Sequence, residues 1–343
     1  MWEERAHRAR RDIAALAASG LGVAELHSAA IDVVGRQVST DLTCWATIDP
    51  DTLVISTMTN GPTPSPAEYD PLLAESEYLA GQPHSFAGLA RRGSTMAKLS
   101  DMSADDRRRS LRVQTVWRPL GIDQELRLMF RVDGTCWGAA GMVRTGSDFT
   151  DRETDYLAAV APALATATRL AVRSEAGHPA TGRPAILVVG PDGALRAATP
   201  AAQEWRERLD AIAPGRFAVM MQVMASGARS TVSGGFRARV RDAQGQWASL
   251  NASPLMGETD DDVAVVIEPV SGDQLVGLLL AAYGLTPRER EVCQEVMAGR
   301  STADIAASLF ISVNTVQDHL KSIFAKVAVR SRGELVARLR PAG

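Results

Sequence analysis

The chain has 343 residues, 45% of them hydrophobic, and a formal net charge of −3 at pH 7. The hydrophobic content is ample for buried cores, and a chain of this length usually folds into two or three domains. The overall charge does not by itself indicate a DNA-binding protein. The cysteines, Cys44, Cys136 and Cys293, are widely separated and lack both a C-x-x-C pair and metal-ligand spacing, which favours reduced thiols.

The sequence gives no sign of a membrane segment. The N-terminal stretch MWEERAHRARRDI is charged and lacks the apolar region of a signal peptide. The longest apolar run, Leu275–Tyr283, is too short to span a bilayer. We therefore expect a cytoplasmic protein with no membrane partner.

Residues 1–173 are predicted to form one α+β domain. Amphipathic helices at Arg8–Ala18 and Val23–Val38 come first. Strands at Leu42–Ile48 and Thr52–Thr59 then flank the turn Asp49-Pro50-Asp51, which predicts a hairpin. After a long mixed region the predicted elements are a second hairpin, Glu125–Val132 and Thr135–Val143 around Asp133-Gly134, and a helix that is capped at Thr150 and runs through Val172.

This order of elements, with the phrases CWATIDPDT and WGAAGMVR followed by FTDRE, resembles the GAF sensory domain. The resemblance implies a ligand pocket between a curved antiparallel sheet and the neighbouring helices. Aromatic and sulfur-containing side chains suit such a lining, although they can equally serve as ordinary core packing. His27 and His84 have no second histidine at ligand spacing, so we expect no metal or other cofactor. The candidate pocket residues are Cys44, Trp45, Trp117, Cys136 and Trp137.

Residues 174–183 are polar and rich in glycine and proline, which predicts a linker. The following segment, 184–270, begins with a strand, an Asp-Gly turn, a second strand and a helix entered at Thr199-Pro200. Its helical content between Pro214 and Gly227 is poorly defined by the sequence. Three strand-like runs close it: Thr231–Arg241, Trp247–Pro254 and Val263–Pro269. The order resembles a small α+β PAS domain; the alternative is a strand extension of the first domain.

Residues 271–283 are predicted to form a connecting helix. Leu275, Leu279 and their apolar neighbours are too hydrophobic to lie bare in water. This helix must therefore pack against a dimer partner or a sensory domain, and the sequence leaves both alternatives open.

Residues 284–343 read as four short capped helices. Thr286-Pro287-Arg288-Glu289 forms a capping box, and the pattern recurs at Ser301–Asp304 and Ser331–Glu334, while Ser312 can cap the third helix. Gly299 supplies a helix stop. A short turn at Phe310-Ile311 joins the second and third helices, which is helix-turn-helix geometry. The predicted core of this all-α domain is Ile305, Ala306, Leu309, Val316, Leu320 and Ile323.

The same segment resembles the LuxR-type (FixJ/NarL-like) DNA-binding domain, through LTPREREV, IAASLFIS, NTVQDHLKSIFAKV and VRSRGEL. The resemblance implies that the third helix enters the major groove with Gln317, Asp318 and Lys321 toward the bases. Gln317 can bond adenine and Lys321 can donate to guanine. Asp318 either accepts from cytosine or simply pairs with Lys321 within the helix. The full predicted DNA-contacting set is Ser312, Asn314, Thr315, Gln317, Asp318, Lys321, Lys326, Arg330 and Arg332.

The charge distribution supports this location for DNA binding. From Tyr283 onward nine basic and six acidic residues give +3, which leaves 28 basic and 34 acidic residues, or −6, on the remainder. A basic module on an acidic body confines phosphate attraction to one end of the chain. Because +3 is modest, we expect a homodimer on paired half-sites.

Several absences narrow the type of regulator. The sequence has no phosphate-binding G-x-x-x-x-G-K-[ST], no alternating βα pattern of a phosphoacceptor receiver, and no H-E-x-x-H or G-x-S-x-G motif, so we expect no enzyme. The prediction is a one-component transcription regulator. Its multidomain body senses a small-molecule effector and controls binding of a dimer to a double-stranded DNA operator, with RNA polymerase as a further candidate partner. The alternative is a body that is a protein-interaction module without a small-molecule ligand.

Overall fold

The structure is a computed structural model that describes residues 2–175, 182–212, 214–231, 234–242, 245–256, 261–270 and 272–339. Contacts group these residues into two compact units. One unit combines the residues up to Ala171 with those from 182 to Pro269, and the other combines residues 172–175 with those from Val270 onward. We describe each unit separately.

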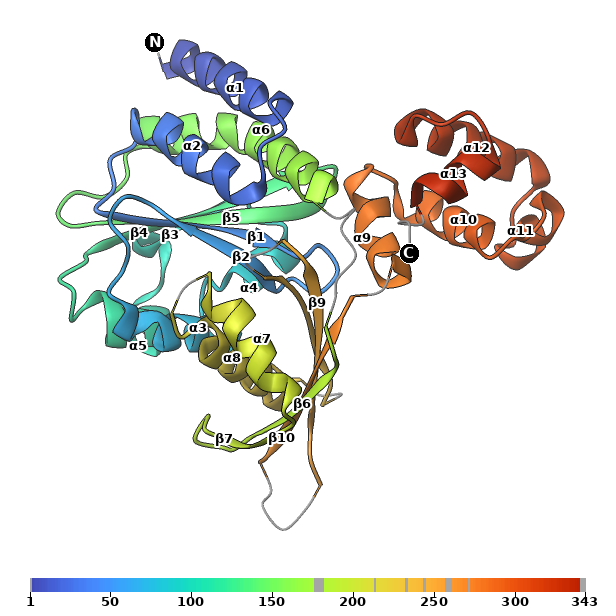
Figure 1. Cartoon of the computed structure of the whole chain (residues 1–343). Coiled ribbons are helices and arrows are strands. Elements are labelled where there is room, and N and C mark those ends of the chain that lie inside the picture. The colour runs from blue at the N-terminus through green and yellow to red at the C-terminus, as the bar shows by residue number, and fades with distance from the viewer. Residues whose placement is uncertain are drawn as a thin grey trace. The chain divides into compact units, whose positions relative to one another are not determined.

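The first unit contains two antiparallel sheets, of which the N-terminal one has the strand order β2-β1-β5-β4-β3. Helices α1, α2 and α6 lie over one face of this sheet, and α3, α4 and α5 lie over the other (Figure 1). The elements are α1 (Trp2–Ala18), α2 (Val23–Gly35), β1 (Leu42–Ile48), β2 (Ile55–Asn60), η1 (Ala67–Tyr69), α3 (Asp70–Tyr78), α4 (Phe86–Arg92), β3 (Met96–Lys98), η2 (Leu99–Asp101), α5 (Ala104–Arg109), η3 (Val113–Trp117), β4 (Gln124–Val132), β5 (Thr135–Arg144) and α6 (Asp151–Glu175).

Both predicted hairpins of this sheet are present. β1 pairs with β2, and β4 pairs with β5 through a turn in which Asp133 and Gly134 have φ of 52° and 74°. Two positive φ values at the central residues are those of the tight hairpin turn that Asp-Gly favours. Helices cover both faces of the sheet, so Arg127 on β4 is buried and forms ion pairs with Glu77 and Glu125.

The second sheet of this unit has the strand order β7-β6-β10-β9-β8. Trp205 and Leu209 of α7 and Met224 of α8 are fully buried against it. The elements are β6 (Ala185–Val189), β7 (Leu195–Ala198), α7 (Ala201–Asp210), α8 (Arg216–Ser230), β8 (Phe236–Arg241), β9 (Trp247–Pro254) and β10 (Val263–Pro269).

The structure corrects two details of the predicted middle segment. The stretch after Pro214, which the sequence leaves undefined, is a continuous helix of 15 residues, α8. This helix runs to Ser230, so the strand expected from Thr231 begins at Phe236 instead. The methionines that blur the helical pattern are core residues: Met220, Met221 and Met224 are buried. The unbranched side chain of methionine fills irregular gaps in a core.

Buried contacts hold the two sheets together in one unit. Helix α3 packs against α8, and β2 lies beside β8. The Arg239 guanidinium donates to both carboxylate oxygens of Asp49, at 2.6 and 2.9 Å, and the Asp49 side chain is 1% exposed. The Tyr78 and Phe236 rings meet edge to face. The predicted linker between the two segments falls partly outside the described residues, and its first residues, Ser174 and Glu175, belong to α6.

The second unit is helical: α9 (Gly272–Ala282), α10 (Pro287–Met297), α11 (Thr302–Ser308), α12 (Val313–Val327) and α13 (Arg332–Leu339). The apolar side chains of α9, Leu275 and Leu279 among them, are buried, and this helix contacts α10 and α13. The predicted connecting helix is thus part of the terminal unit. Within the described ranges, no helix combines the length and hydropathy needed to cross a membrane.

Candidate nucleic-acid interface

The helices of the terminal unit begin at the residues that the sequence indicates. The Thr286 hydroxyl accepts from the Glu289 N–H, and the Glu289 carboxylate accepts from the Thr286 N–H; Ser301 and Asp304 repeat this reciprocal pair. The third expected capping box, at Ser331–Glu334, has a different set of hydrogen bonds. Ser331 accepts from the N–H of Glu334, whose carboxylate binds the N–H of Arg330 instead.

A tight turn joins α11 to α12. Phe310 has a left-handed backbone with φ of 54°, and the N–H of Ile311 donates to the carbonyl of Ala306 at 3.0 Å. The guanidinium of Arg288, on α10, donates to the carbonyl of Leu309. Ser312 then caps α12 by accepting from the Thr315 N–H. The turn is therefore fixed from both sides, which is the helix-turn-helix geometry expected from the sequence.

Helix α12 has one buried face and one exposed face. Val316, Leu320 and Ile323 are 0–8% exposed and pack in the small core with Ile305, Ala306 and the half-buried Leu309. The opposite stripe consists of side chains three and four positions apart, and all four are exposed: Asn314, Gln317, Asp318 and Lys321. This spacing places them on one side of the helix.

Two members of this stripe pair with each other. The ammonium of Lys321 donates to a carboxylate oxygen of Asp318 at 3.2 Å, and the two side chains are 78% and 75% exposed. An ion pair that is this exposed contributes little to the free energy of unfolding. In the free protein Asp318 therefore has the intrahelical partner that the sequence left open as an alternative to a base contact.

Lys326 has a partner within the unit that spacing in the sequence does not reveal. Its ammonium donates to the Glu289 carboxylate at 2.6 Å, and the Ser322 hydroxyl donates to the same carboxylate. Burial opposes ionisation of Glu289, but the bonds from Lys326, Ser322 and Thr286 outweigh it and lower its pKa to about 2. The ion pair ties α12 to α10. A phosphate contact by Lys326 stays a prediction, because its side chain is still 34% exposed.

The other predicted phosphate ligands lie near the ends of α12. The hydroxyls of Ser312 and Thr315 hydrogen-bond each other at 2.8 Å. The guanidinium of Arg332 donates to the carbonyl of Arg300 at 2.8 Å, whereas Arg330 is exposed. Hydroxyl and guanidinium groups at helix ends are typical contacts to a DNA backbone.

Comparison with known proteins places this unit in a family. The profile described as "Bacterial regulatory proteins, luxR family" matches residues 284–339. The spore germination protein GerE of Bacillus subtilis is 40% identical over 55 residues, which cover 16% of this chain and 74% of GerE. The chain belongs to the luxR family of bacterial regulatory proteins. Residues 284–339 are its luxR-type helix-turn-helix domain.

A second relative of this luxR-family protein matches over a similarly short stretch. The CsgBAC operon transcriptional regulatory protein of Escherichia coli is 47% identical over 53 residues, which are 16% of this chain and 24% of that protein. The chain thus spans about a quarter of that relative's length. The crystal structure of Escherichia coli SdiA aligns with 97% of this chain and 95% of its own at 13% identity, with a TM-score of 0.31, too low to support a conclusion about the body.

The side chains proposed to line a sensory pocket in this luxR-family protein do not gather around one cavity. Trp45 packs edge to face against His27 and Phe130. Cys136 lies in a separate cluster with Phe86, Leu89 and Met129. Trp117 belongs to a third cluster, around Leu99, Met102 and Ile122, while Trp137 is 1% exposed and Cys44 is half-buried. A pocket lined by all five residues is therefore not supported by their positions.

His27 is a core residue in this arrangement. Its Nε2 lies 3.0 Å from the Thr168 hydroxyl, and burial lowers its pKa to about 4, so the ring is neutral at pH 7. Burial also raises the pKa of Cys136 to about 11 and that of Cys44 to about 12, so both sulfurs remain thiols. All three cysteines are free.

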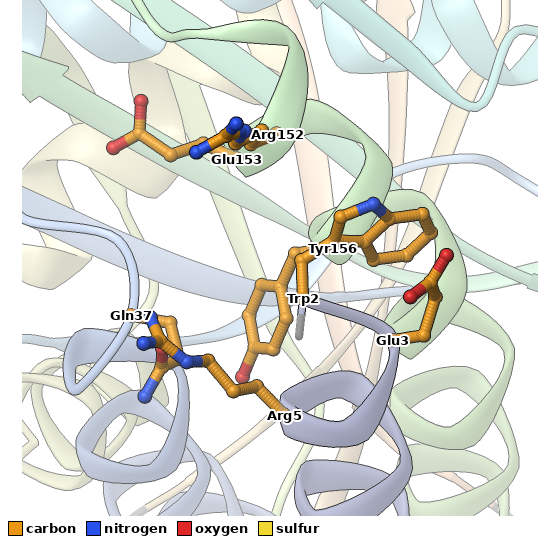
Figure 2. A pocket seen from close by; sticks show the side chains of 7 residues that line it. All are labelled: Trp2, Glu3, Arg5, Gln37, Arg152, Glu153 and Tyr156. Carbon is orange, nitrogen blue, oxygen red and sulfur yellow. The ribbon is translucent and has the colours of Figure 1, made fainter.

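The first unit has a surface hollow that the sequence did not reveal. Its volume is about 450 Å³, and it lies between α1, the residue Gln37 after α2, and the first turns of α6 (Figure 2). Tyr156 is 3% exposed, and among the described residues its hydroxyl has no hydrogen-bond partner. The lining residues are Trp2, Glu3, Arg5, Gln37, Arg152, Glu153 and Tyr156.

Proposed function

We propose that this protein is a one-component regulator whose body responds to a signal and whose terminal unit reads an operator. The observation that carries the proposal is the exposed stripe Asn314, Gln317, Asp318 and Lys321 on α12, the second helix of the helix-turn-helix. A helix presented in this way docks in the major groove. Gln317 and Lys321 carry the groups that bond adenine and guanine edges.

The proposed contacts to the DNA backbone come from both ends of α12. The Ser312 and Thr315 hydroxyls bind phosphate at its N-terminal end, and Arg330 and Arg332 bind phosphate beyond its C-terminal end. Lys326 combines its bond to Glu289 with attraction for the DNA backbone. Such contacts set affinity and its salt dependence, whereas the base contacts set sequence preference.

The test is selection of duplexes from a random pool by the full chain, repeated with Gln317→Ala. We expect the variant to lose preference at one base position, equivalent to about 1–3 kcal/mol, because a bidentate contact discriminates by that amount. Gln294→Ala, on the exposed side of α10, is the matched control and should select the wild-type consensus. An unchanged consensus for Gln317→Ala would mean that α12 is docked in another register.

We infer that the operator-bound form is a homodimer. A net charge of +3 from Tyr283 onward gives one copy few phosphate contacts, and affinity grows with the number of contacts. Two copies on half-sites about one helical turn apart double that number. Sedimentation of the protein with a selected duplex measures the stoichiometry; one copy per duplex at saturation contradicts this step.

For the body, the two antiparallel sheets with their flanking helices support GAF-like and PAS-like sensory segments at residues 1–173 and 184–270. The linker at 174–183 and the connecting helix at 271–283 complete the proposed division. We infer that the signal is a small molecule. The hollow beside the Tyr156 hydroxyl, which has no hydrogen-bond partner in the part of the chain that the structure describes, is a site of suitable size, since ligand pockets are typically about 300–1,000 Å³.

A thermal-shift screen of small molecules tests the sensory role. A ligand that binds the folded chain raises its melting temperature in proportion to the logarithm of ligand concentration. A hit that acts in the hollow should lose its shift in Tyr156→Phe and keep it in Tyr78→Phe. If no compound shifts the melting temperature, the alternative applies: a body that binds a partner protein, with DNA binding controlled by sequestration.

A further inference from the structure

The turn between α11 and α12 exposes an aromatic side chain that the folded chain does not use. Phe310 is 95% exposed, and among the large hydrophobic residues described as exposed only Met256 is more so. The side chain thus gains almost nothing from burial on folding.

The backbone at Phe310 adds a second cost. Its φ of 54° is in the left-handed region, where Cβ crowds the following carbonyl and a bulky side chain is strained by roughly 1–2 kcal/mol. Glycine would adopt this conformation without strain. A phenylalanine that is both strained and exposed therefore does not stabilise the folded monomer, and its contribution lies in contacts outside it.

The position of Phe310 in the chain indicates what it contacts. Phe310 precedes Ser312, the N-cap residue of α12, by two positions. In helix-turn-helix docking, side chains at this N-terminal end of the second helix read bases. The bond from Arg288 to the Leu309 carbonyl and the bond from the Ile311 N–H to Ala306 hold the backbone on either side of it. The phenyl ring is thus presented from a fixed backbone.

We propose that Phe310 is an apolar DNA contact that packs on thymine methyl groups or deoxyribose at the edge of the groove entered by α12. This inference rests on the proposed function and adds a specificity determinant to it. Phenylalanine is among the side chains that recognise the thymine methyl group. A protein partner is less well matched, because hot spots lie within larger apolar surroundings. In the described part of the terminal unit, the other large hydrophobic side chain that is exposed is Val313, at 43%.

The experiment measures binding of the full chain to a duplex that the wild-type protein has selected from a random pool. Phe310→Gly should weaken binding roughly tenfold, the equivalent of losing burial of most of one face of the ring. The dependence of affinity on salt should stay unchanged, because no phosphate contact is lost. Stability to urea should be equal to or above that of wild type, since the left-handed strain is relieved. A structural role predicts the opposite change in stability.

Two further substitutions separate the side chain from the backbone. Phe310→Leu keeps an apolar group and should bind within about threefold of wild type. Phe310→Asn tolerates the left-handed conformation but is polar, and should bind as weakly as Phe310→Gly. Met256→Gly removes an exposed hydrophobic residue from the first unit and should leave affinity unchanged.

The proposal is overturned if Phe310→Gly and Phe310→Asn both bind within twofold of wild type, or if leucine and asparagine bind alike. Gln317→Ala on the same duplex distinguishes this result from a failure of the proposed function. If Gln317→Ala weakens binding while the Phe310 variants do not, DNA reading by α12 stands and Phe310 has no part in it. If Gln317→Ala is also silent, the docking of α12 itself is wrong.

Discussion

At the scale of single residues, the exposed stripe of α12 combines attraction and repulsion for DNA. Lys321 is proposed to donate to a guanine edge, yet in the free protein its ammonium is 3.2 Å from the Asp318 carboxylate. Binding must either separate this pair or let Asp318 accept from a cytosine amino group. Separation of the pair weakens binding, whereas a contact from Asp318 to cytosine strengthens it. One substitution at Asp318 therefore distinguishes the two outcomes.

We predict that Asp318→Asn strengthens binding to unrelated duplexes several-fold. Removing the carboxylate frees Lys321 and removes a negative charge from the face that we propose enters the groove between the two phosphate backbones. Titration of random-sequence and selected duplexes at two salt concentrations gives the measurement, with Glu291→Gln on α10 as the matched control. Loss of preference at a cytosine position, without a gain on random sequence, would instead show that Asp318 contacts a base.

At the scale of elements, one buried carboxylate joins two helices of the terminal unit. Glu289 completes the capping box of α10 and also accepts from Ser322 and Lys326 on α12. Its side chain is 6% exposed, so removing its charge takes the counter-ion away from Lys326 and weakens the hydrogen bonds to a buried group. The orientation of α12 thus depends on a residue that lies outside its exposed stripe.

The lowered pKa of Glu289 predicts how stability changes with pH. In the unfolded chain the carboxyl titrates near its ordinary value of 4.5, and in the folded chain its pKa is about 2. Its contribution, about 3 kcal/mol, is therefore complete well above pH 4.5 and is lost as the pH falls toward 2.

Glu289→Gln should unfold more easily at pH 7, and its stability should vary less between pH 4.5 and 2 than that of wild type. Urea unfolding of both proteins, followed by circular dichroism at several pH values, measures this difference. Glu295→Gln, at the other end of α10, serves as the comparison. Parallel pH profiles for wild type and Glu289→Gln would contradict the assignment.

At the scale of the whole molecule, the two sheets of the body behave as one compact unit because charged side chains are buried where they meet. Arg239 of β8 binds both oxygens of Asp49 and also Asp51, residues that lie nearly two hundred positions earlier in the chain. Asp49 is itself fixed, since it accepts from the N–H groups of Asp51 and Thr52. This buried ion pair therefore links the two sheets directly.

Arg239→Ala should lower the free energy of unfolding of the body by about 3 kcal/mol, because it leaves the Asp49 carboxylate buried without its cation. Arg237→Ala, which changes an exposed residue two positions earlier on the same strand, should cost less than about 0.5 kcal/mol. Urea unfolding followed by tryptophan fluorescence reports on this unit, since every tryptophan lies at or before Trp247. Equal losses of unfolding free energy in the two variants would show that the ion pair does not hold the sheets together.

The sequence by itself determined the features that depend on neighbours within a few residues. Thr286 and Glu289, Ser301 and Asp304, and the Asp133-Gly134 turn are recognisable because caps and turns are made by residues two to four positions apart. The terminal helix-turn-helix is assembled almost entirely from such signals. Its resemblance to the luxR family was therefore readable from the chain and was confirmed by comparison.

Tertiary structure alone decided the contacts between distant residues. Lys326 meets Glu289 across 37 positions, and Arg239 meets Asp49 across 190. The same dependence on distant contacts explains why the residues of the predicted pocket lie apart. Trp45, Trp117 and Cys136 all look suitable in the sequence, but each packs in a different cluster, which is set by the face of the sheet and the helices that cover it. Which side chains share a cavity depends on how elements pack, and packing is not encoded at short range.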